Sequence, residues 1–199
     1  MPLDDGQLSQ QMLTQLRDQL KSKYPEAEPQ PFQIDLTKAI SKATVTALKT
    51  MAVAPALAPA PVVAGIGTGI TVEPSLMVNT AKLLMAAQVG QVGEALETIL
   101  NPIMKSIADH LKLAIVQSTS GFGGQPGPIQ NITEPVLTPL IISNFPPKVI
   151  ANLQTSPYGL IFVKAISAGI AAGVSAGQAA LVPFGTTPPS PGLLIAKFS

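Results

Sequence analysis

Apolar residues recur at steps of three and four positions along three stretches of the chain. The stretches cover residues 36–47, 96–115 and 163–174. Such steps place side chains on one face of a helix, so the pattern predicts three amphipathic helices. Between the helices lie Pro- and Gly-rich segments and short apolar runs, among them GITV, PIQNI and LLIAKF, whose length suits extended strands better than helices.

A short repeat links two of these predicted helices. Lys-Ala-Ile-Ser occurs at residues 38–41 and again at 164–167, which is 126 positions later. A middle copy is expected near residues 98–101, where the second predicted helix lies. A Glu-Pro pair also recurs, at 73–74 and 134–135, with an offset of 61 positions. Together these recurrences predict an internal triplication.

The predicted fold is mainly α with short β segments (α+β), built from three divergent tandem units. The units cover residues 3–71, 72–132 and 133–199 and are about 61–69 residues long. Each is expected to contain two helices, a Pro/Gly loop and one strand, and the three units are expected to pack as one domain. The strands are too short to form a sheet alone, so they are expected to pair with one another or with neighbouring subunits.

Local signals add finer expectations about the helices. Asp35 and Thr37 are candidate N-caps of the first long helix. Pro102 leaves two alternatives open, because the second helix either bends there or begins anew with Asn101 as its cap. The equivalent positions in the first helices of the three units are expected to be Leu8, Leu76 and Leu137.

Composition limits how such helices pack. Hydrophobic residues make up 46% of the chain but aromatic residues only 4%, so small aliphatic side chains have to fill the interior in close contact. Charged residues make up 12% and the net charge is +1, with no run of like charges, which disfavours a nucleic-acid partner. So little charge leaves apolar surface for other subunits to cover, and the expected partners are further copies of the chain and other structural proteins.

Candidate chemistry is sparse. The chain has no cysteine and one histidine, His110, which excludes disulfides and thiolate metal sites and leaves little for a catalytic triad. Ser41 and Ser167 lie in no nucleophile elbow. GIGTGI at residues 65–70 lacks the Gly-Lys-Ser/Thr ending of a phosphate loop, so a turn entering a strand is favoured over a ligand-binding or enzymatic domain. We predict no catalytic, cofactor-binding or metal-ligating residue and no small-molecule substrate.

Residues 158–182 support the main alternative, a membrane-inserting helix. The stretch has one charged residue, Lys164, and Gly169, Gly173 and Gly177 form small-residue steps that let helices approach closely in a bilayer. Against insertion, Gly, Ala and Ser drive it weakly, and a lysine near the membrane centre costs about 3 kcal/mol. A helix buried in an assembly is therefore favoured over contact with a membrane.

Three stretches, FQIDLTKAISKATVTAL, AGIGTGITV and SAGIAAGVSAG, combine Gly-Thr-Gly turns with Ala-rich helices that end near Pro/Gly tracts. With the low charge and the lack of cysteine, this combination resembles structural proteins of tailed bacteriophage particles, particularly contractile-tailed ones. The resemblance implies a non-enzymatic virion component of the neck, tail, baseplate or capsid, assembled in the host cytoplasm. The acidic start MPLDDG agrees with this expectation, because a signal peptide begins with basic residues.

The residues expected in the core and at the interfaces are apolar members of the predicted helices and of the last strand. Residues 193–198 are expected to form a strand that is exchanged with a neighbouring subunit. The full set is Leu100, Ile103, Ile107, Leu111, Ile166, Ile170, Leu193, Leu194, Ile195 and Phe198.

Overall fold

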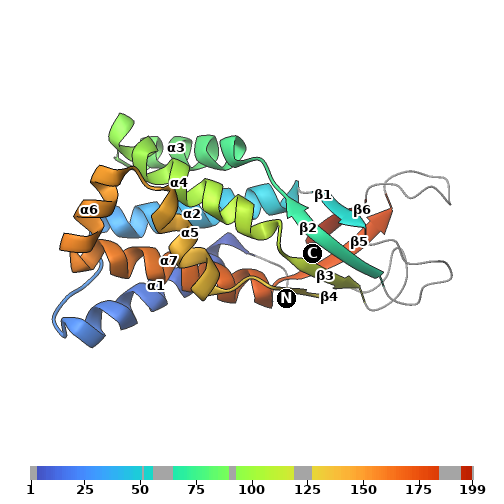
Figure 1. The fold of residues 1–199 in the computed structure, drawn as a ribbon, viewed down its shortest axis with the longest axis horizontal. Coiled ribbons are helices and arrows are strands. Elements are labelled where there is room, and N and C mark those ends of the chain that lie inside the picture. Colours follow the sequence, from blue (N-terminus) through green and yellow to red (C-terminus); the bar gives the residue numbers. More distant parts are fainter. Residues whose placement is uncertain are drawn as a thin grey trace.

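Helices followed by a pair of strands occur three times along the chain (Figure 1). The computed structural model describes residues 4–50, 52–55, 65–89, 93–118, 127–183 and 194–198. The first set is α1 (Asp5–Lys23), α2 (Pro31–Lys49), β1 (Ala52–Pro55) and β2 (Gly65–Thr71). The second is α3 (Pro74–Val89), α4 (Glu94–Leu111), β3 (Ile115–Ser118) and β4 (Gly127–Gln130). The third is α5 (Glu134–Asn144), α6 (Pro147–Thr155), α7 (Pro157–Ala176), β5 (Gln178–Pro183) and β6 (Leu194–Phe198).

The fold class predicted from the sequence, mainly α with short β segments, is confirmed. Each predicted unit, however, ends in two strands where the pattern predicts one. The first strands of the three sets begin at residues 52, 115 and 178, a constant period of 63 residues (115 − 52 and 178 − 115). With this period, residues 101–104 of α4 stand at the place that Lys-Ala-Ile-Ser occupies in α2 and α7.

Burial repeats together with the helices and strands. Residues 4–18, 73–87 and 133–147, which cover most of α1, most of α3 and all of α5, have the same order of buried, half-buried and exposed positions at all 15 places. This order corrects one expected equivalence, because Met77, and not Leu76, corresponds to Leu8 and Leu137. Leu76 is 42% exposed, whereas the side chains of the other three are in the core. The Glu-Pro pairs therefore align the two units one residue out of place.

The helices form a ring of outer and inner members. The outer helices are α1, α3 and α5, and each packs between two of the inner helices α2, α4 and α7. The last inner helix, α7, packs against α1 and closes the ring, while α6 packs on α7. The six core residues predicted on α4 and α7 are all at most 1% exposed: Leu100, Ile103, Ile107, Leu111, Ile166 and Ile170.

The six strands close into an antiparallel barrel at one end of the helical ring (Figure 1). Strands pair in chain order, and β6 pairs with both β5 and β1, where Leu194 stands opposite Val53. The expected exchange of residues 193–198 with another subunit is therefore wrong for the strand Leu194–Phe198, because closing the barrel uses both of its edges within one chain. Leu193 lies outside the described residues.

GIGTGI forms most of strand β2, so the expected turn is wrong. Val53 stands opposite Ile70 and Ala54 opposite Thr68, which leaves Gly69 in a β-bulge. Gly69 has a φ of +76° and donates its N–H to the carbonyl of Ala114 at 3.0 Å. A positive φ suits glycine, since a side chain there meets the backbone. The stretch is a sheet element and does not form a phosphate loop.

Helix α2 begins earlier than its predicted caps. It starts at Pro31, and the N–H of Gln30 donates to Oε1 of Gln33 at 2.9 Å, which satisfies one of the free groups at the helix start. Asp35 and Thr37 lie inside the helix, and the Thr37 hydroxyl donates to the carbonyl of Gln33 at 2.7 Å. Capping by Asp35 or Thr37 is therefore wrong.

Helix α4 runs without interruption through Pro102. It covers Glu94–Leu111, so a new helix beginning at this proline is excluded. The carbonyl of Pro102 accepts a hydrogen bond from the buried hydroxyl of Ser106 at 2.7 Å. The helix ends before Ile115, which begins strand β3, although Ile115 continues the helical spacing in the sequence.

Close approach of α7 to α1 depends on two glycines. A Cβ built on Gly169 would lie 2.4 Å from Cγ, 2.7 Å from Cα and 2.9 Å from the backbone nitrogen of Met12. A Cβ on Gly173 would lie 2.2 Å from Cδ1 of Leu8. The small-residue spacing that resembles a membrane pattern therefore serves contact between two helices of the same chain.

We predict that Gly169→Ala lowers the free energy of unfolding by about 1–3 kcal/mol, because its Cβ meets backbone atoms that cannot move alone. Urea unfolding followed by circular dichroism measures the change. The control is Gly159→Ala in the same helix, whose Cβ meets the flexible end of Leu153 at 2.5 Å. This control is expected to be neutral or to stabilise by up to about 1 kcal/mol through helix propensity. Equal destabilisation by the two changes would contradict the packing account.

Candidate interaction surface

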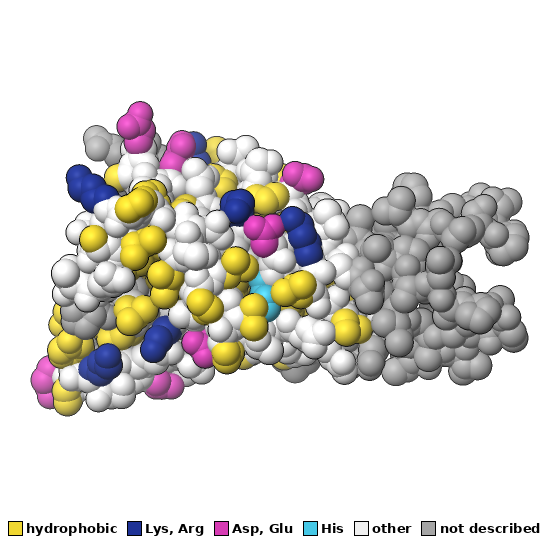
Figure 2. Space-filling view, in the orientation of Figure 1, with side chains coloured by type: hydrophobic (Ala, Val, Ile, Leu, Met, Phe, Trp, Pro, Cys, Tyr) yellow, Lys and Arg dark blue, Asp and Glu magenta, His cyan; other side chains and the backbone are white. Residues whose placement is uncertain are grey.

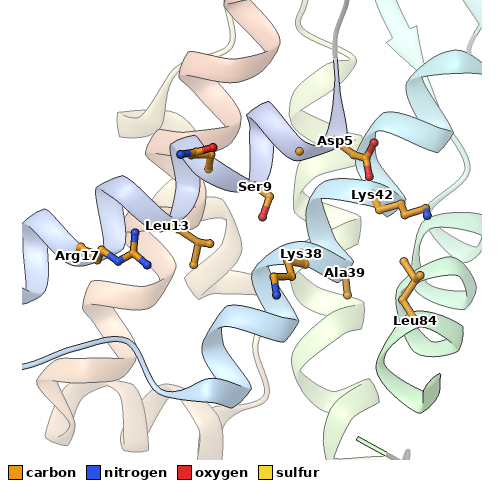
Figure 3. Close-up of a pocket in the computed structure, with 10 residues that line it drawn as sticks. Asp5, Ser9, Leu13, Arg17, Lys38, Ala39, Lys42 and Leu84 are labelled. Atoms are coloured by element: carbon orange, nitrogen blue, oxygen red, sulfur yellow. The ribbon is translucent and has the colours of Figure 1, made fainter. Parts of the chain in front are cut away.

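A surface groove lies between α1, α2 and α3 (Figure 3). Its volume is about 530 Å³. Most of its walls come from α1, and the rest from the middle of α2 and one residue of α3. The lining residues are Asp5, Gly6, Ser9, Gln10, Leu13, Arg17, Lys38, Ala39, Lys42 and Leu84.

The groove follows the axis of α1. Its lining residues on that helix extend from Asp5 to Arg17, a rise of about 18 Å at 1.5 Å per residue. Leu13 and Leu84, which are both partly exposed, supply apolar contact surface within it. The groove therefore has the length of a short helix and an apolar strip in its lining.

Cations predominate at this groove. Arg17, Lys38 and Lys42 line it together with a single carboxylate, Asp5. Lys38 lies 3.7 Å from Oδ1 of Asp35, while Arg17 and Lys42 form no ion pair with any residue that the structure describes. The local charge is positive, although that of the chain as a whole is close to zero.

The single histidine is buried at the contact of α4 with the start of α5. His110 is 1% exposed, and its Nε2 accepts a hydrogen bond from the N–H of Thr133 at 2.9 Å. Burial lowers the pKa of His110, because the charged ring would lose its hydration. An accepting Nε2 also requires the neutral ring, so His110 acts as a structural acceptor at the cap of α5.

The residues considered for catalysis have structural partners. The Ser41 hydroxyl donates to the carbonyl of Asp5, and the Ser167 hydroxyl to the carbonyl of Val163 at 2.9 Å, both in the core. Glu97 pairs with Lys82 on the surface. Within the described parts of the chain, acidic residues and the histidine form no group of three that could hold a metal ion.

Asp109 illustrates the surface electrostatics of α4. Its carboxylate accepts a hydrogen bond from Lys112 at 2.7 Å and lies 3.6 Å from Lys105. The hydrogen bond from Lys112 holds the pKa of Asp109 below its ordinary value. Since all three side chains are partly exposed, this cluster contributes little to stability.

The predicted spanning helix 158–182 is shorter in the structure. It ends at Ala176, where Gly177 turns extended and donates its N–H to the carbonyls of Gly173 and Val174. Among the described helices, one stretch, Tyr158–Ala176, is long and apolar enough to cross a membrane, with a mean hydropathy of 1.7 over its window. Of that window, 56% is buried inside the protein.

Large apolar side chains are exposed on the helical part. Hydrophobic side chains spread over the face in Figure 2, with charged groups between them and toward its edges. Leu83 is 73% and Leu113 is 58% exposed. The other large exposed apolar residues of the described chain are Phe32, Leu76, Val136 and Tyr158.

The predicted interface residues and the groove are different parts of the molecule. The predicted members on α4 and α7 fill the core, whereas the groove was not predicted. A signal for it exists in the sequence, because Lys38 and Lys42 are one helical turn apart with no acidic residue four positions after either. Its third wall, α3, could not be assigned from that signal.

No protein-family model, characterised protein or solved structure matches the chain. The resemblance to phage structural proteins therefore stays a prediction.

We predict that stability falls as the pH drops from 7 to 5. The pKa of His110 is lower in the folded state than its unfolded value of about 6.5, so the unfolded chain takes up the proton first and is favoured below that pH. His110→Gln keeps an acceptor for Thr133 but does not titrate. Urea unfolding at several pH values should show this loss for the wild type and a much flatter profile for the variant. A variant profile as steep as that of the wild type would contradict the assignment.

Proposed function

We propose that this chain is a non-enzymatic structural subunit of a larger symmetric assembly, and that the assembly is a bacteriophage particle. Its place would be the neck, the tail, the baseplate or a capsid-associated position. The observation that carries the proposal is the exposure of large apolar side chains on a chain whose core is already filled. Only 12% of the residues in the chain are charged, so few charges surround these apolar side chains. Covering them with other subunits removes apolar surface from water and is therefore favourable.

The arrangement of the fold supports this function. Three sets of helices and strands surround one axis and are held by a closed ring and a closed barrel. A body of this kind keeps its shape without a partner, so its outer helices offer fixed surfaces for docking. His110 and the Ser167 hydroxyl are engaged in hydrogen bonds within the helical core, which supports a structural role for both.

A second candidate function is membrane insertion by α7. The observation that favours it is the length and apolar composition of Tyr158–Ala176. Insertion would require α7 to leave α1, which would lose the contacts of Gly169 with Met12 and of Gly173 with Leu8. Those contacts favour the assembly function.

We predict a mass above the 20.5 kDa of one chain when the purified protein is measured by gel filtration with light scattering. Leu83→Lys and Leu113→Lys should each weaken self-association by about tenfold, because each loses roughly 1–2 kcal/mol of apolar burial. The matched control is Ser143→Lys, at the position of α5 that corresponds to Leu83. A monomer at every concentration would contradict the proposal.

Liposome flotation separates the two functions. A structural subunit stays in the dense fraction, whereas an inserted α7 carries the protein to the top of the gradient. Flotation that is lost on Ile170→Lys would support insertion, provided that circular dichroism shows the variant to be folded.

A further inference from the structure

The helices α3, α4 and α5 pack in the same order as the groove helices α1, α2 and α3, and the place between them is the second interhelical site. The shared burial order of the outer helices relates α3 to α5 by 60 residues. The inner helices α2 and α4 share theirs at an offset of 63, over residues 39–50 and 102–113. The pairs of equivalent residues are Lys42 with Lys105, Thr46 with Asp109, and Leu84 with Asn144. The groove and the second interhelical site therefore carry a lysine at the same place.

At the second interhelical site the lysine has partners within the chain. Nζ of Lys105 donates to Oδ1 of Asn144 at 3.0 Å and lies 3.6 Å from Oδ2 of Asp109. The Asn144 amide in turn donates to the hydroxyl of Ser106 at 3.0 Å, so it links α5 to α4. These contacts satisfy the cation and draw the two helices together.

In the groove between α1, α2 and α3, other residues replace the two side chains that accept from Lys105. Thr46 occupies the position equivalent to Asp109, and Leu84 occupies the position equivalent to Asn144. Lys42 is left without an ion pair among the described residues. Arg17 adds a further cation, although the equivalent positions 86 and 146 hold alanine and proline. This groove is thus open, positively charged and partly apolar.

We propose that this groove binds an acidic amphipathic helix of a partner protein. Its length of about 18 Å corresponds to roughly 12 residues of helix. The occupant lays its apolar stripe against Leu13 and Leu84, a helix-in-groove contact. Carboxylates one turn apart face Lys38 and Lys42, and another faces Arg17, which complements the charge of the groove. This inference rests on the proposed function, which supplies the partner.

Binding is tested with a fluorescein-labelled synthetic peptide of about 14 residues, in which leucines form one helical face and glutamates flank it at i and i+4 spacing. Fluorescence anisotropy compares the full-length wild type with the double variant Arg17→Glu/Lys42→Glu. The matched control is Lys105→Glu, which changes the equivalent lysine of the second interhelical site. A second peptide has lysine at every glutamate position, and circular dichroism checks that each variant is folded.

The expected result is saturable binding of the acidic peptide that weakens by about tenfold or more in the double variant, stays unchanged in the control and falls with added salt. Equal binding of the basic peptide, or equal binding by the double variant, would overturn the proposal. Full displacement by millimolar inorganic phosphate would assign the groove to a small anion. Loss of self-association in the double variant, with no peptide binding by the wild type, would assign the groove to a second copy of the chain. Displacement by phosphate and this loss of self-association would each refute a partner helix.

These outcomes are separable from failure of the proposed function. A chain that assembles in light scattering but ignores the acidic peptide loses this inference alone. A chain that binds the peptide through Arg17 and Lys42 but stays monomeric keeps the groove and loses self-assembly.

Discussion

Closure of the ring, in which the last set of elements packs and pairs with the first, is the interaction on which the rest of the structure depends. Strands of four to seven residues are too short to be stable in isolated pairs, and here every strand has two neighbours because β6 returns to pair with β1. The same closure brings α7 against α1, so that each outer helix is covered on two sides. Without this closure, the first and third sets would each lose a neighbour.

Close contact between inner and outer helices explains the composition. Equivalent places on the three inner helices hold Ala43, Ser106 and Gly169, all small, and the outer helices approach there. Such contacts favour alanine, glycine and short hydroxyl side chains over aromatic ones. A short hydroxyl side chain at such a contact can donate to carbonyls of its own helix and of the neighbouring helix, as Ser106 does to Pro102 and Leu140.

Interior and surface positions differ in how alike the three sets are. The equivalent buried positions 16, 85 and 145 hold leucine, methionine and phenylalanine, which differ in shape but are all apolar. The equivalent exposed positions 17, 86 and 146 hold arginine, alanine and proline. Packing constrains the buried positions and leaves the exposed positions free to vary. Equivalent places on the surface of the three sets therefore acquire unlike chemistry. A groove that lacks its internal acceptors becomes available to another molecule.

By itself the sequence determined the fold class, the approximate period and the helical faces, because the three- and four-residue steps are local properties of a helix. It could not determine that Ile115 leaves the helical pattern for a strand, that GIGTGI joins a sheet, or that β6 stays within its own chain. Those outcomes depend on which distant segments become neighbours. The groove also depends on distant segments becoming neighbours. Leu84 and Lys42 line one groove only because α3 packs on α2, and no local pattern specifies that packing.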